Sequence, residues 1–294
     1  MLKTRELYFF LIPALVFYIL FKYLPIYGLQ IAFRDFSPVF GFWKSPWVGL
    51  DNFRRFFNAA DWFRLIRNTL NISLASLIIG FPVPIILALL LHHTGSRAFK
   101  RTAQMITYAP YFISSVVLVG MIYVLFSPST GIVNTLLGKA GIGPYFFMGR
   151  EQYFVPMYVG SGIWQGAGWS AVVYMAALSG VNPELHESAL IDGANKIQRI
   201  WHVDIPSILP AIITMFLLQV GTLFTVGFDK VYLMQNPLNL TASEVISTFT
   251  YKRGILDGDY SFATAIGMME SSINFLLLAF FNRIAKWISG SGLW

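Results

Sequence analysis

The stretch from His186 to Pro210, HESALIDGANKIQRIWHVDIPSILP, decides the fold. It carries the densest charge in the second half of the chain, at Glu187, Asp192, Lys196, Arg199 and Asp204. The apolar blocks on either side are long enough to cross a bilayer, which takes about 20 helical residues. A charged segment between two such blocks predicts a surface loop of an all-α, polytopic membrane protein.

The loop itself is predicted to form two short helices around a glycine turn. Asn182 suits an N-cap, Pro183 suits the first helical position, and Gly193 can end the helix in a left-handed turn. A second short helix is expected from residue 194 to about residue 203. A rigid unit that is half apolar and half charged suits a surface that docks in a groove of a soluble partner and transmits force.

The composition favours a membrane protein as well. The 294-residue chain is 56% hydrophobic and 12% charged, whereas soluble domains are about 25% charged. It has no cysteine, which excludes disulfides and thiolate metal sites. The net charge is +7, but the basic residues stand singly or in pairs between apolar blocks. That pattern favours contact with anionic lipid over contact with nucleic acid.

We expect six membrane spans with both termini in the cytoplasm. They are placed near residues 8–32, 69–91, 105–127, 154–180, 209–228 and 262–282. The short basic loop His92–Gln104 is the clearest cytoplasmic signal. The segment Asp51–Asn68 argues against this orientation because it holds four arginines. We expect that segment to be an amphipathic helix in the head-group layer or a plain surface helix.

The chain is expected to form one integrated membrane domain with short additions at its ends. Residues 1–68 hold the first span and the external amphipathic segment. Residues 69–283 form the transmembrane core, which includes the loop 182–208. Residues 284–294 are a cytoplasmic tail.

The loop resembles the EAA loop of ABC-importer permeases, whose pattern is roughly E-A-A-x-x-x-D-G-A followed later by an aromatic residue and L-P. The matching positions are Glu187, Ser188 and Ala189 for E-A-A, Asp192, Gly193 and Ala194 for D-G-A, Ile200 for the aromatic position, and Ile205 with Pro206 for L-P. Ser188 replaces an alanine, and Trp201 directly follows Ile200. Either Ile200 or Trp201 could therefore fill the pocket of a partner ATPase.

Three further stretches extend the resemblance over almost the whole chain. NTL at Asn68–Leu70 and FDKVYLM at Phe228–Met234 are similar to carbohydrate-importer permeases. The opening Leu11–Phe36 resembles the LplB-like permeases, a branch that handles complex oligosaccharides in Gram-positive bacteria. This resemblance implies a type I ABC importer permease fold in the cell membrane. It also implies a related but different second permease, two cytoplasmic ATPases and an extracellular solute-binding protein as partners.

The sequence contains no obvious nucleotide site of its own. A phosphate-binding loop needs a pattern such as G-x-x-x-x-G-K-[ST], and the only Gly-Lys pair, Gly138-Lys139, is followed by Ala140. We therefore expect no cofactor in this chain and no enzymatic activity of its own. ATP and magnesium are expected in the partner ATPase.

Polar and aromatic residues inside the spans are candidates for a substrate pathway. They are Trp164, Gln165, Trp169 and Tyr174 in the fourth span, Gln219 in the fifth, Asp229 after it, and Glu270 and Asn274 in the sixth. Sugars stack on aromatic rings, and their hydroxyls bind amides or carboxylates. Helix packing, assisted by Gly162, Gly166 and Gly168, is an equally good explanation. Trp164 and Trp169 are not expected to point the same way, since five positions differ by roughly 140°.

Glu270 has three possible roles: it can bind sugar hydroxyls, pair with Lys22, or be neutral. Two other classes of protein remain as alternatives. An ion-coupled secondary transporter would show inverted repeats and several midplane carboxylates. A membrane-embedded enzyme would need paired carboxylates or a histidine cluster. His92, His93, His186 and His202 are not expected to form such a site or to bind a metal.

Overall fold

The computed structural model describes residues 5–290 and 292–294, and in that part of the chain every named element is a helix. One isolated antiparallel bridge, Arg34 with Trp47, is the β-type pairing among these residues. The all-α prediction is therefore confirmed. The chain divides into two compact units, Met1–Trp62 with Phe249–Ser272, and Phe63–Thr248 with Ile273–Trp294. Each unit is described by itself.

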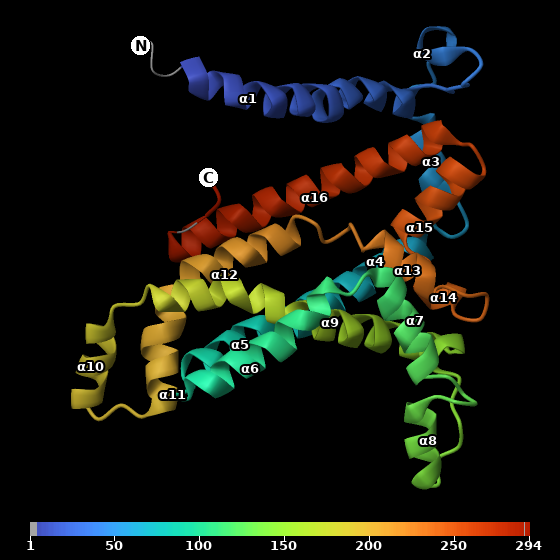
Figure 1. Ribbon diagram of the computed structural model, residues 1–294. Coiled ribbons are helices and arrows are strands. Elements are labelled where there is room, and N and C mark those ends of the chain that lie inside the picture. The colour runs from blue at the N-terminus through green and yellow to red at the C-terminus, as the bar shows by residue number, and fades with distance from the viewer. Residues whose placement is uncertain (1–4, 291) are drawn as a thin grey trace. The chain divides into compact units, whose positions relative to one another are not determined.

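The first unit begins with one long apolar helix. It runs from α1 (Arg5–Tyr18) through a π-helical turn (Ile19–Tyr23) into a 3-10 segment (Leu24–Phe33) (Figure 1). The unit further contains α2 (Gly41–Lys44), α3 (Asp51–Asn58), the second half of α15 (Ile246–Tyr251), a π-helical turn (Lys252–Leu256) and the first part of α16 (Tyr260–Ser289).

The amphipathic segment after the first span is fastened within this unit. Arg55 of α3 forms an ion pair of 2.6 Å with Asp259, and its guanidinium lies over the Phe262 ring at 4.9 Å. Phe56 is fully buried. The amphipathic helix predicted over residues 51–68 is interrupted between α3 and α4 (Trp62–Ala75). Arg55 thus has a carboxylate of the same chain as its partner.

The second unit holds most of the remaining helices. After α4 come a π-helical turn (Ser76–Gly80), α5 (Pro82–His92), α6 (Arg97–Tyr108), a 3-10 turn (Ala109–Phe112), α7 (Ser115–Leu125), α8 (Ile132–Lys139), a 3-10 turn (Phe147–Gly149) and α9 (Glu151–Ser179). Then follow α10 (Pro183–Ile191), α11 (Lys196–Arg199), a π-helical turn (Ile200–Asp204), α12 (Ile205–Val220), α13 (Phe228–Met234), α14 (Leu240–Ser243) and the last part of α16.

Several of these helices are long and apolar enough to cross a membrane. Among the described residues there are four such helices, Phe9–Phe33, Trp62–His92, Lys196–Val220 and Tyr260–Ser289, or five if the bent pair Arg97–Phe112 with Ser115–Leu125 is one span. They overlap five of the predicted spans, although the helix Lys196–Val220 both begins and ends before the predicted span 209–228 does. The other predicted span corresponds to α9, which is 29 residues long. The count of six spans therefore stays a prediction.

The predicted span near 105–127 is two helices that meet at an angle of 102°. Pro110 lies in the short 3-10 turn before the break and lacks the N–H that a continuous helix needs. After the break the Ser114 side chain caps α7 by accepting a hydrogen bond of 3.3 Å from the Val117 amide. Local sequence thus both ends the first helix and starts the second.

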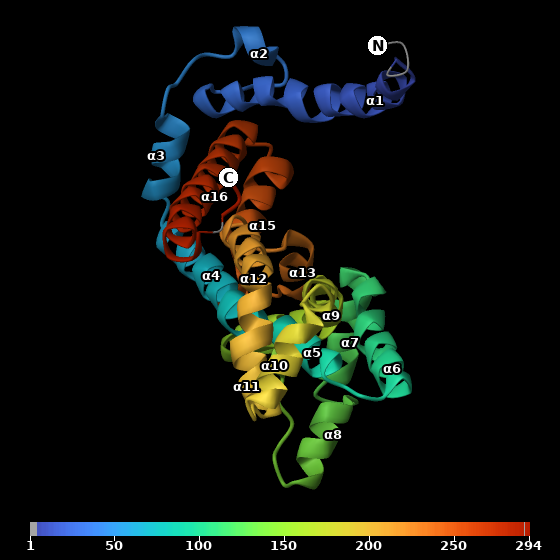
Figure 2. The ribbon, with the colours of Figure 1, turned by 90° about the vertical axis from the view of Figure 1, so that its left-hand side faces the viewer.

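Helix α9 is the centre of the second unit. It packs against α5 and α6, and both views show α9 passing beside α5 (Figures 1 and 2). At Gly168 a Cβ atom would lie 2.0 Å from the Thr107 carbonyl oxygen, so the backbones of α9 and α6 touch there. Gly168 therefore serves close packing, as proposed for small residues in membrane helices.

The polar residues that open the second span hold a distant loop in place. The Asn68 amide donates to the carbonyls of Thr241 at 2.8 Å and Glu244 at 3.0 Å. The Thr69 hydroxyl accepts a hydrogen bond of 3.1 Å from the Ile246 amide. Both side chains are buried, and a buried polar group needs such partners to offset its desolvation. The NTL residues are therefore structural in this unit.

Candidate functional site

The loop between α9 and α12 begins with a well-capped helix. The Asn182 side chain accepts a hydrogen bond of 3.1 Å from the Glu184 amide, and Pro183 is the first residue of α10. These are the roles predicted from the sequence. The cap fixes where the chain leaves α9 and turns into α10.

The end of α10 is a Schellman turn built on a glycine. Gly193 has a φ of +77°. The Ala194 amide donates to the Ala189 carbonyl at 2.9 Å, and the Gly193 amide donates to the Leu190 carbonyl at 3.0 Å. This pair of bonds defines the motif, and a residue with a Cβ is strained at such a φ. The predicted glycine turn is confirmed.

The second half of the loop differs from the prediction of a separate helix over residues 194–203. Helix α11 starts at an Asn195–Gln198 capping box. It then passes through the π-helical turn Ile200–Asp204 directly into α12, so Lys196–Val220 is one helix. Figure 1 shows α10 and α11 as a pair at the end of the unit where the loop lies. The loop is therefore joined to the fifth predicted span without an intervening break.

The exposed face of the loop is both charged and apolar. Glu187, Ser188, Asp192, Gly193 and Pro206 are exposed, and Ala189 and Ala194 are half-buried. Ile200 packs against a buried cluster that includes Ala88, Leu178 and Ile208, whereas Trp201 is 63% exposed. Of the two residues that the sequence left open, Trp201 is the one whose side chain a partner can reach.

The inner face of the loop is tied to the end of α5 through a buried carboxylate. Asp204 is fully buried, and its Oδ2 lies 2.6 Å from Nε2 of His93. Its Oδ1 lies 3.2 Å from Nε2 of His186 in α10. The Lys196 ammonium donates to the His93 carbonyl at 3.0 Å. These contacts join α10, the π-helical turn and α5 at one point.

Three of the four histidines, from which the sequence predicted no catalytic or metal site, lie close together. His92, His93 and His186 converge near Asp204, while the His202 ring lies against the Gln198 carbonyl instead. The sequence signal that could have found the cluster is Asp204 itself, since a carboxylate at the start of an apolar helix needs partners. His92 is adjacent to the His186 ring, with centroids 6.5 Å apart.

A cavity of about 610 Å³ lies in the second unit and involves α5, α9, α12 and α13. We term it the polar cavity because amide, phenol and ammonium groups reach its otherwise mostly apolar lining. Three predicted pathway residues line it: Gln165, Tyr174 and Gln219. A smaller cavity of about 140 Å³ shares Gln219 with it and adds Thr222 and Thr225. Together these cavities carry amide and hydroxyl groups from Gln165, Gln219, Thr222 and Thr225, on a lining that is mostly apolar in the larger cavity.

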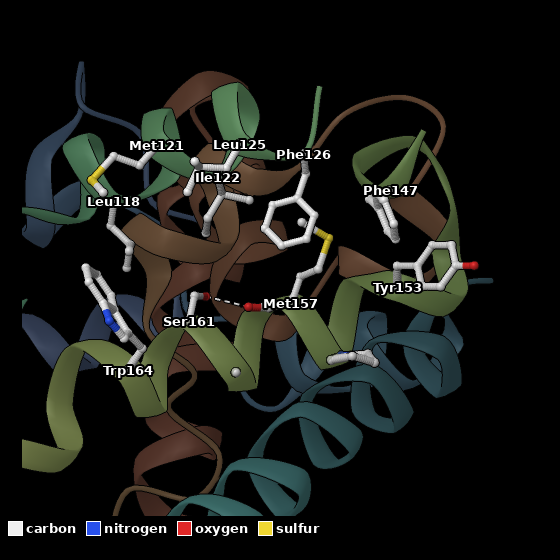
Figure 3. Close-up of a pocket in the computed structure, with 12 residues that line it drawn as sticks. Leu118, Met121, Ile122, Leu125, Phe126, Phe147, Tyr153, Met157, Ser161 and Trp164 are labelled. Atoms are coloured by element: carbon white, nitrogen blue, oxygen red, sulfur yellow. Dashed lines mark hydrogen bonds between the residues drawn. The ribbon is translucent and has the colours of Figure 1, made fainter. Parts of the chain in front are cut away.

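The two predicted tryptophans lie elsewhere in the unit. Trp164 lines a separate, mostly apolar cavity of about 540 Å³ together with Met157 of the same helix and Met121 and Ile122 of α7 (Figure 3). Trp169 stacks on Tyr111 with ring centroids 4.8 Å apart. Neither tryptophan lines the polar cavity, and the prediction that the two side chains point in different directions stays a prediction.

The other predicted pathway residues are also outside the polar cavity. Asp229 is exposed in the first turn of α13. Asn274 is buried, accepts a hydrogen bond of 2.9 Å from the Phe224 amide and donates one of 2.9 Å to the Thr225 hydroxyl. It thus fixes the chain between α12 and α13.

Glu270 belongs to the first unit. Its Oε1 is buried and has no hydrogen-bond partner among the described residues. Lys22, the partner proposed from the sequence, is exposed. The structure does not pair these two side chains.

Lys230 is the functional candidate that sequence reasoning missed. Its ammonium donates a hydrogen bond of 2.7 Å to the Tyr158 carbonyl and lies 4.5 Å from the centre of the Tyr158 ring. It lines the polar cavity and is 9% exposed. Burial lowers the pKa of Lys230 to about 8. The sequence analysis selected the neighbouring Asp229 instead, because a sequence does not show that α9 packs against Lys230.

Comparison with known proteins extends over the full chain. A family model described as the inner membrane component of binding-protein-dependent transport systems matches residues 80–290. Protein LplB of Bacillus subtilis (strain 168) is 41% identical over 291 residues, which cover 99% of this chain and 92% of LplB. The polygalacturonan/rhamnogalacturonan transport system permease protein YteP of the same organism is 36% identical over 294 residues, covering 100% of this chain and 92% of YteP.

A solved structure has the same fold. It is a chain of a bacterial alginate ABC transporter in complex with an alginate pentasaccharide-bound periplasmic protein. The TM-score is 0.92 and the identity 34%, covering 99% of this chain and 97% of the other. Because the family model matches most of the chain and the relatives match all of it, the chain belongs to the inner membrane components of binding-protein-dependent transport systems, the permease subunits of ABC importers.

Proposed function

We propose that this permease carries oligosaccharides into a bacterial cell and that the polar cavity along α9 is part of their path. The observation that carries the proposal is the position of Gln165, Tyr174, Gln219 and Lys230 around one cavity. Its volume of about 610 Å³ is in the range of small-molecule sites. Amide and phenol groups suit sugar hydroxyls, which both donate and accept hydrogen bonds.

Lys230 favours oligosaccharides that carry carboxylates. Its ammonium has three donors, and one of them is used by the Tyr158 carbonyl. The named substrates of the YteP system and of the alginate transporter include polyuronates, which are acidic. Lys230 is 9% exposed, and a cation shielded from bulk water attracts a carboxylate more strongly than one in bulk solvent does.

The energy for transport is proposed to come from two separate ATPase subunits with their own ATP and magnesium. The loop 182–208 would dock in a groove of one of them on the cytoplasmic side, with Glu187 on a basic or polar element and Trp201 in a pocket. Ser188, Ala189, Asp192, Gly193 and Ala194 would shape the docking helix and its turn, and Pro206 the start of α12. The continuous helix Lys196–Val220 supports this proposal, because a displacement of the loop would reach the cavity at Gln219 directly.

The remaining partners follow from the same assembly. We propose a related second permease beside this chain, an extracellular solute-binding protein that delivers the oligosaccharide, and both termini in the cytoplasm. The alginate transporter, with its saccharide-bound periplasmic protein, supports this arrangement. Ile200 would then serve packing beneath the docking surface, as its contact with the buried cluster suggests.

The test is reconstitution of the complete transporter in proteoliposomes with its binding protein. ATP hydrolysis and uptake are measured with neutral and with acidic oligosaccharides of equal length. We expect acidic oligosaccharides to stimulate both activities more than neutral ones. Stimulation by neutral oligosaccharides alone would show that acidic oligosaccharides are not the substrates. No stimulation by any saccharide would contradict the proposed function.

A further inference from the structure

Three side chains with metal-binding atoms lie close together where the loop 182–208 packs against the end of α5. They are His92 at the end of α5, His186 in α10 and Asp204 in the π-helical turn before α12. One ligand atom from each lies within 4.8 Å of the others. Asp204 is fully buried and His186 is largely covered, so bulk water competes weakly for these atoms.

Two of these atoms face each other without forming a hydrogen bond. Oδ1 of Asp204 and Nε2 of His186 are 3.2 Å apart, yet both are buried and neither has a hydrogen-bond partner among the described residues. A buried polar atom without a partner is costly. Two ligands of a tetrahedral zinc ion, each about 2.0–2.1 Å from the metal, lie about 3.3 Å apart. The spacing of these two atoms therefore suits a shared ion.

His93 supports the carboxylate from the other side. Its Nε2 lies 2.6 Å from Oδ2 of Asp204, the oxygen that does not face His186. Metal-binding carboxylates are commonly held by such an outer contact, which fixes their orientation. His92 has its ring 6.5 Å from the His186 ring, so small rotations of either side chain bring the third nitrogen to the same centre.

We propose that His92, His186 and Asp204 form a binding site for a divalent transition-metal ion, with zinc as the ion that fits best. Two imidazoles and one carboxylate are a common ligand set for zinc. One position would remain for water. The site takes ligands from α5, α10 and the turn before α12, so the bound ion would hold both halves of the loop to the second predicted span. This consequence for the loop rests on the proposed function, whereas the binding of metal does not.

The site is tested by metal binding to the complete purified transporter, with zinc as the probe. The protein is stripped with a chelator, dialysed against buffered zinc and analysed for metal by mass spectrometry. Wild type is compared with His186→Ala and His92→Ala, and His202→Ala is the matched control because it lies in the same loop outside the cluster. We expect His186→Ala and His92→Ala to bind one zinc ion fewer per copy of this chain, and His202→Ala to bind as wild type does.

Cobalt provides a second measurement, which is first made on wild type. Cobalt bound to wild type at a tetrahedral site gives an intense visible spectrum that zinc abolishes. His93→Ala is expected to weaken binding about 10–100-fold, because it removes the outer contact to the carboxylate. Equal zinc content in wild type and His186→Ala, or a cobalt spectrum identical to that of the free ion, would overturn the proposal.

Discussion

The Gln165 side chain donates a hydrogen bond of 2.7 Å to the backbone carbonyl of Ile113. Ile113 lies at the break between the two helices that meet at 102°, where its carbonyl has lost a helical partner. Gln165 also lines the polar cavity. One side chain thus connects the bend of the third predicted span to the wall of the proposed substrate path.

Replacement of this glutamine is expected to loosen the bend. Gln165→Leu leaves the Ile113 carbonyl without its donor, which costs about 1–3 kcal/mol when the group is buried. We expect a lower midpoint of thermal unfolding for the purified transporter. Gln152→Leu is the control, because Gln152 is exposed in the first turn of the same helix. Equal midpoints for wild type and Gln165→Leu would show that the bend does not depend on this bond.

Gln219 is expected to act in transport rather than in folding. It is half-buried and lines both polar cavities, so Gln219→Ala removes an amide from the path while leaving the buried clusters intact. We expect uptake to fall several-fold at unchanged assembly, measured with labelled oligosaccharide in proteoliposomes. Trp164→Ala, which changes the separate apolar cavity, is the comparison. A larger loss in Trp164→Ala would place the path on the other side of α9.

The glycine at the end of α10 gives a test of the loop's shape. Gly193 has a φ of +77°, and a left-handed conformation costs a residue with a Cβ roughly 1–2 kcal/mol. We expect Gly193→Val to lower the ratio of uptake to ATP hydrolysis, and Gly193→Asn to have a smaller effect, because asparagine tolerates this conformation. Gly258→Val imposes the same strain at a φ of +77° in another turn. If both valine variants lowered the ratio equally, strain alone would explain the loss.

Ile200 and Trp201 are adjacent but are expected to behave differently. Ile200→Ala removes a partly buried side chain that packs on the buried cluster, so we expect a loss of stability of about 1–2 kcal/mol, below the range for a fully buried isoleucine. Trp201→Ala removes an exposed side chain and should leave stability unchanged while the ATPase dissociates more readily. Thermal unfolding of this subunit and retention of the ATPase on an affinity column separate the two effects. Weaker retention in Ile200→Ala alone would reverse the assignment.

Lys230 predicts opposite pH dependences for transport and stability. Its pKa is lowered to about 8 by burial, so the ammonium that attracts a carboxylate is lost as the pH rises through 8. We expect stimulation by acidic oligosaccharides to fall between pH 7 and pH 9 in wild type. In Lys230→Met the stimulation should already be low at pH 7 and should change little over this range.

The effect of Lys230 on stability changes with pH in the opposite direction. Between the folded pKa of about 8 and the ordinary value of 10.5, the unfolded state binds more protons, so the free energy of unfolding rises with pH there. Wild type should therefore gain stability relative to Lys230→Met from pH 8 to pH 10. Two results together would contradict a buried lysine with a lowered pKa. Stimulation of wild type by acidic oligosaccharides would not change with pH, and the difference in unfolding free energy between wild type and Lys230→Met would stay constant from pH 8 to pH 10.

Local features of the sequence predicted the local structure well. Asn182, Pro183 and Gly193 act on their immediate neighbours, so their roles in α10 could be derived from residue type and order alone. The long apolar blocks likewise predicted the helical class, because each span satisfies its own backbone hydrogen bonds.

Contacts between distant parts of the chain were not predictable in this way. His93 and Asp204 are separated by 111 residues, and Tyr158 and Lys230 by 72. Which residues meet depends on how α5, α9 and α12 are rotated and shifted against one another. A single sequence does not contain that information. The same reason explains why Trp164 and Gln165, adjacent in sequence, line different cavities.

The proposal that the loop 182–208 receives force from a cytoplasmic ATPase is tested most directly at Glu187. The chain has no cysteine, so Glu187→Cys carries a single reactive thiol in this subunit. In vesicles of known orientation we expect a membrane-impermeant maleimide to label it only from the cytoplasmic side, and a bifunctional cross-linker to join it to the ATPase subunit. Labelling from the outside, or a fully active transporter in which this position cross-links to no ATPase, would contradict the account.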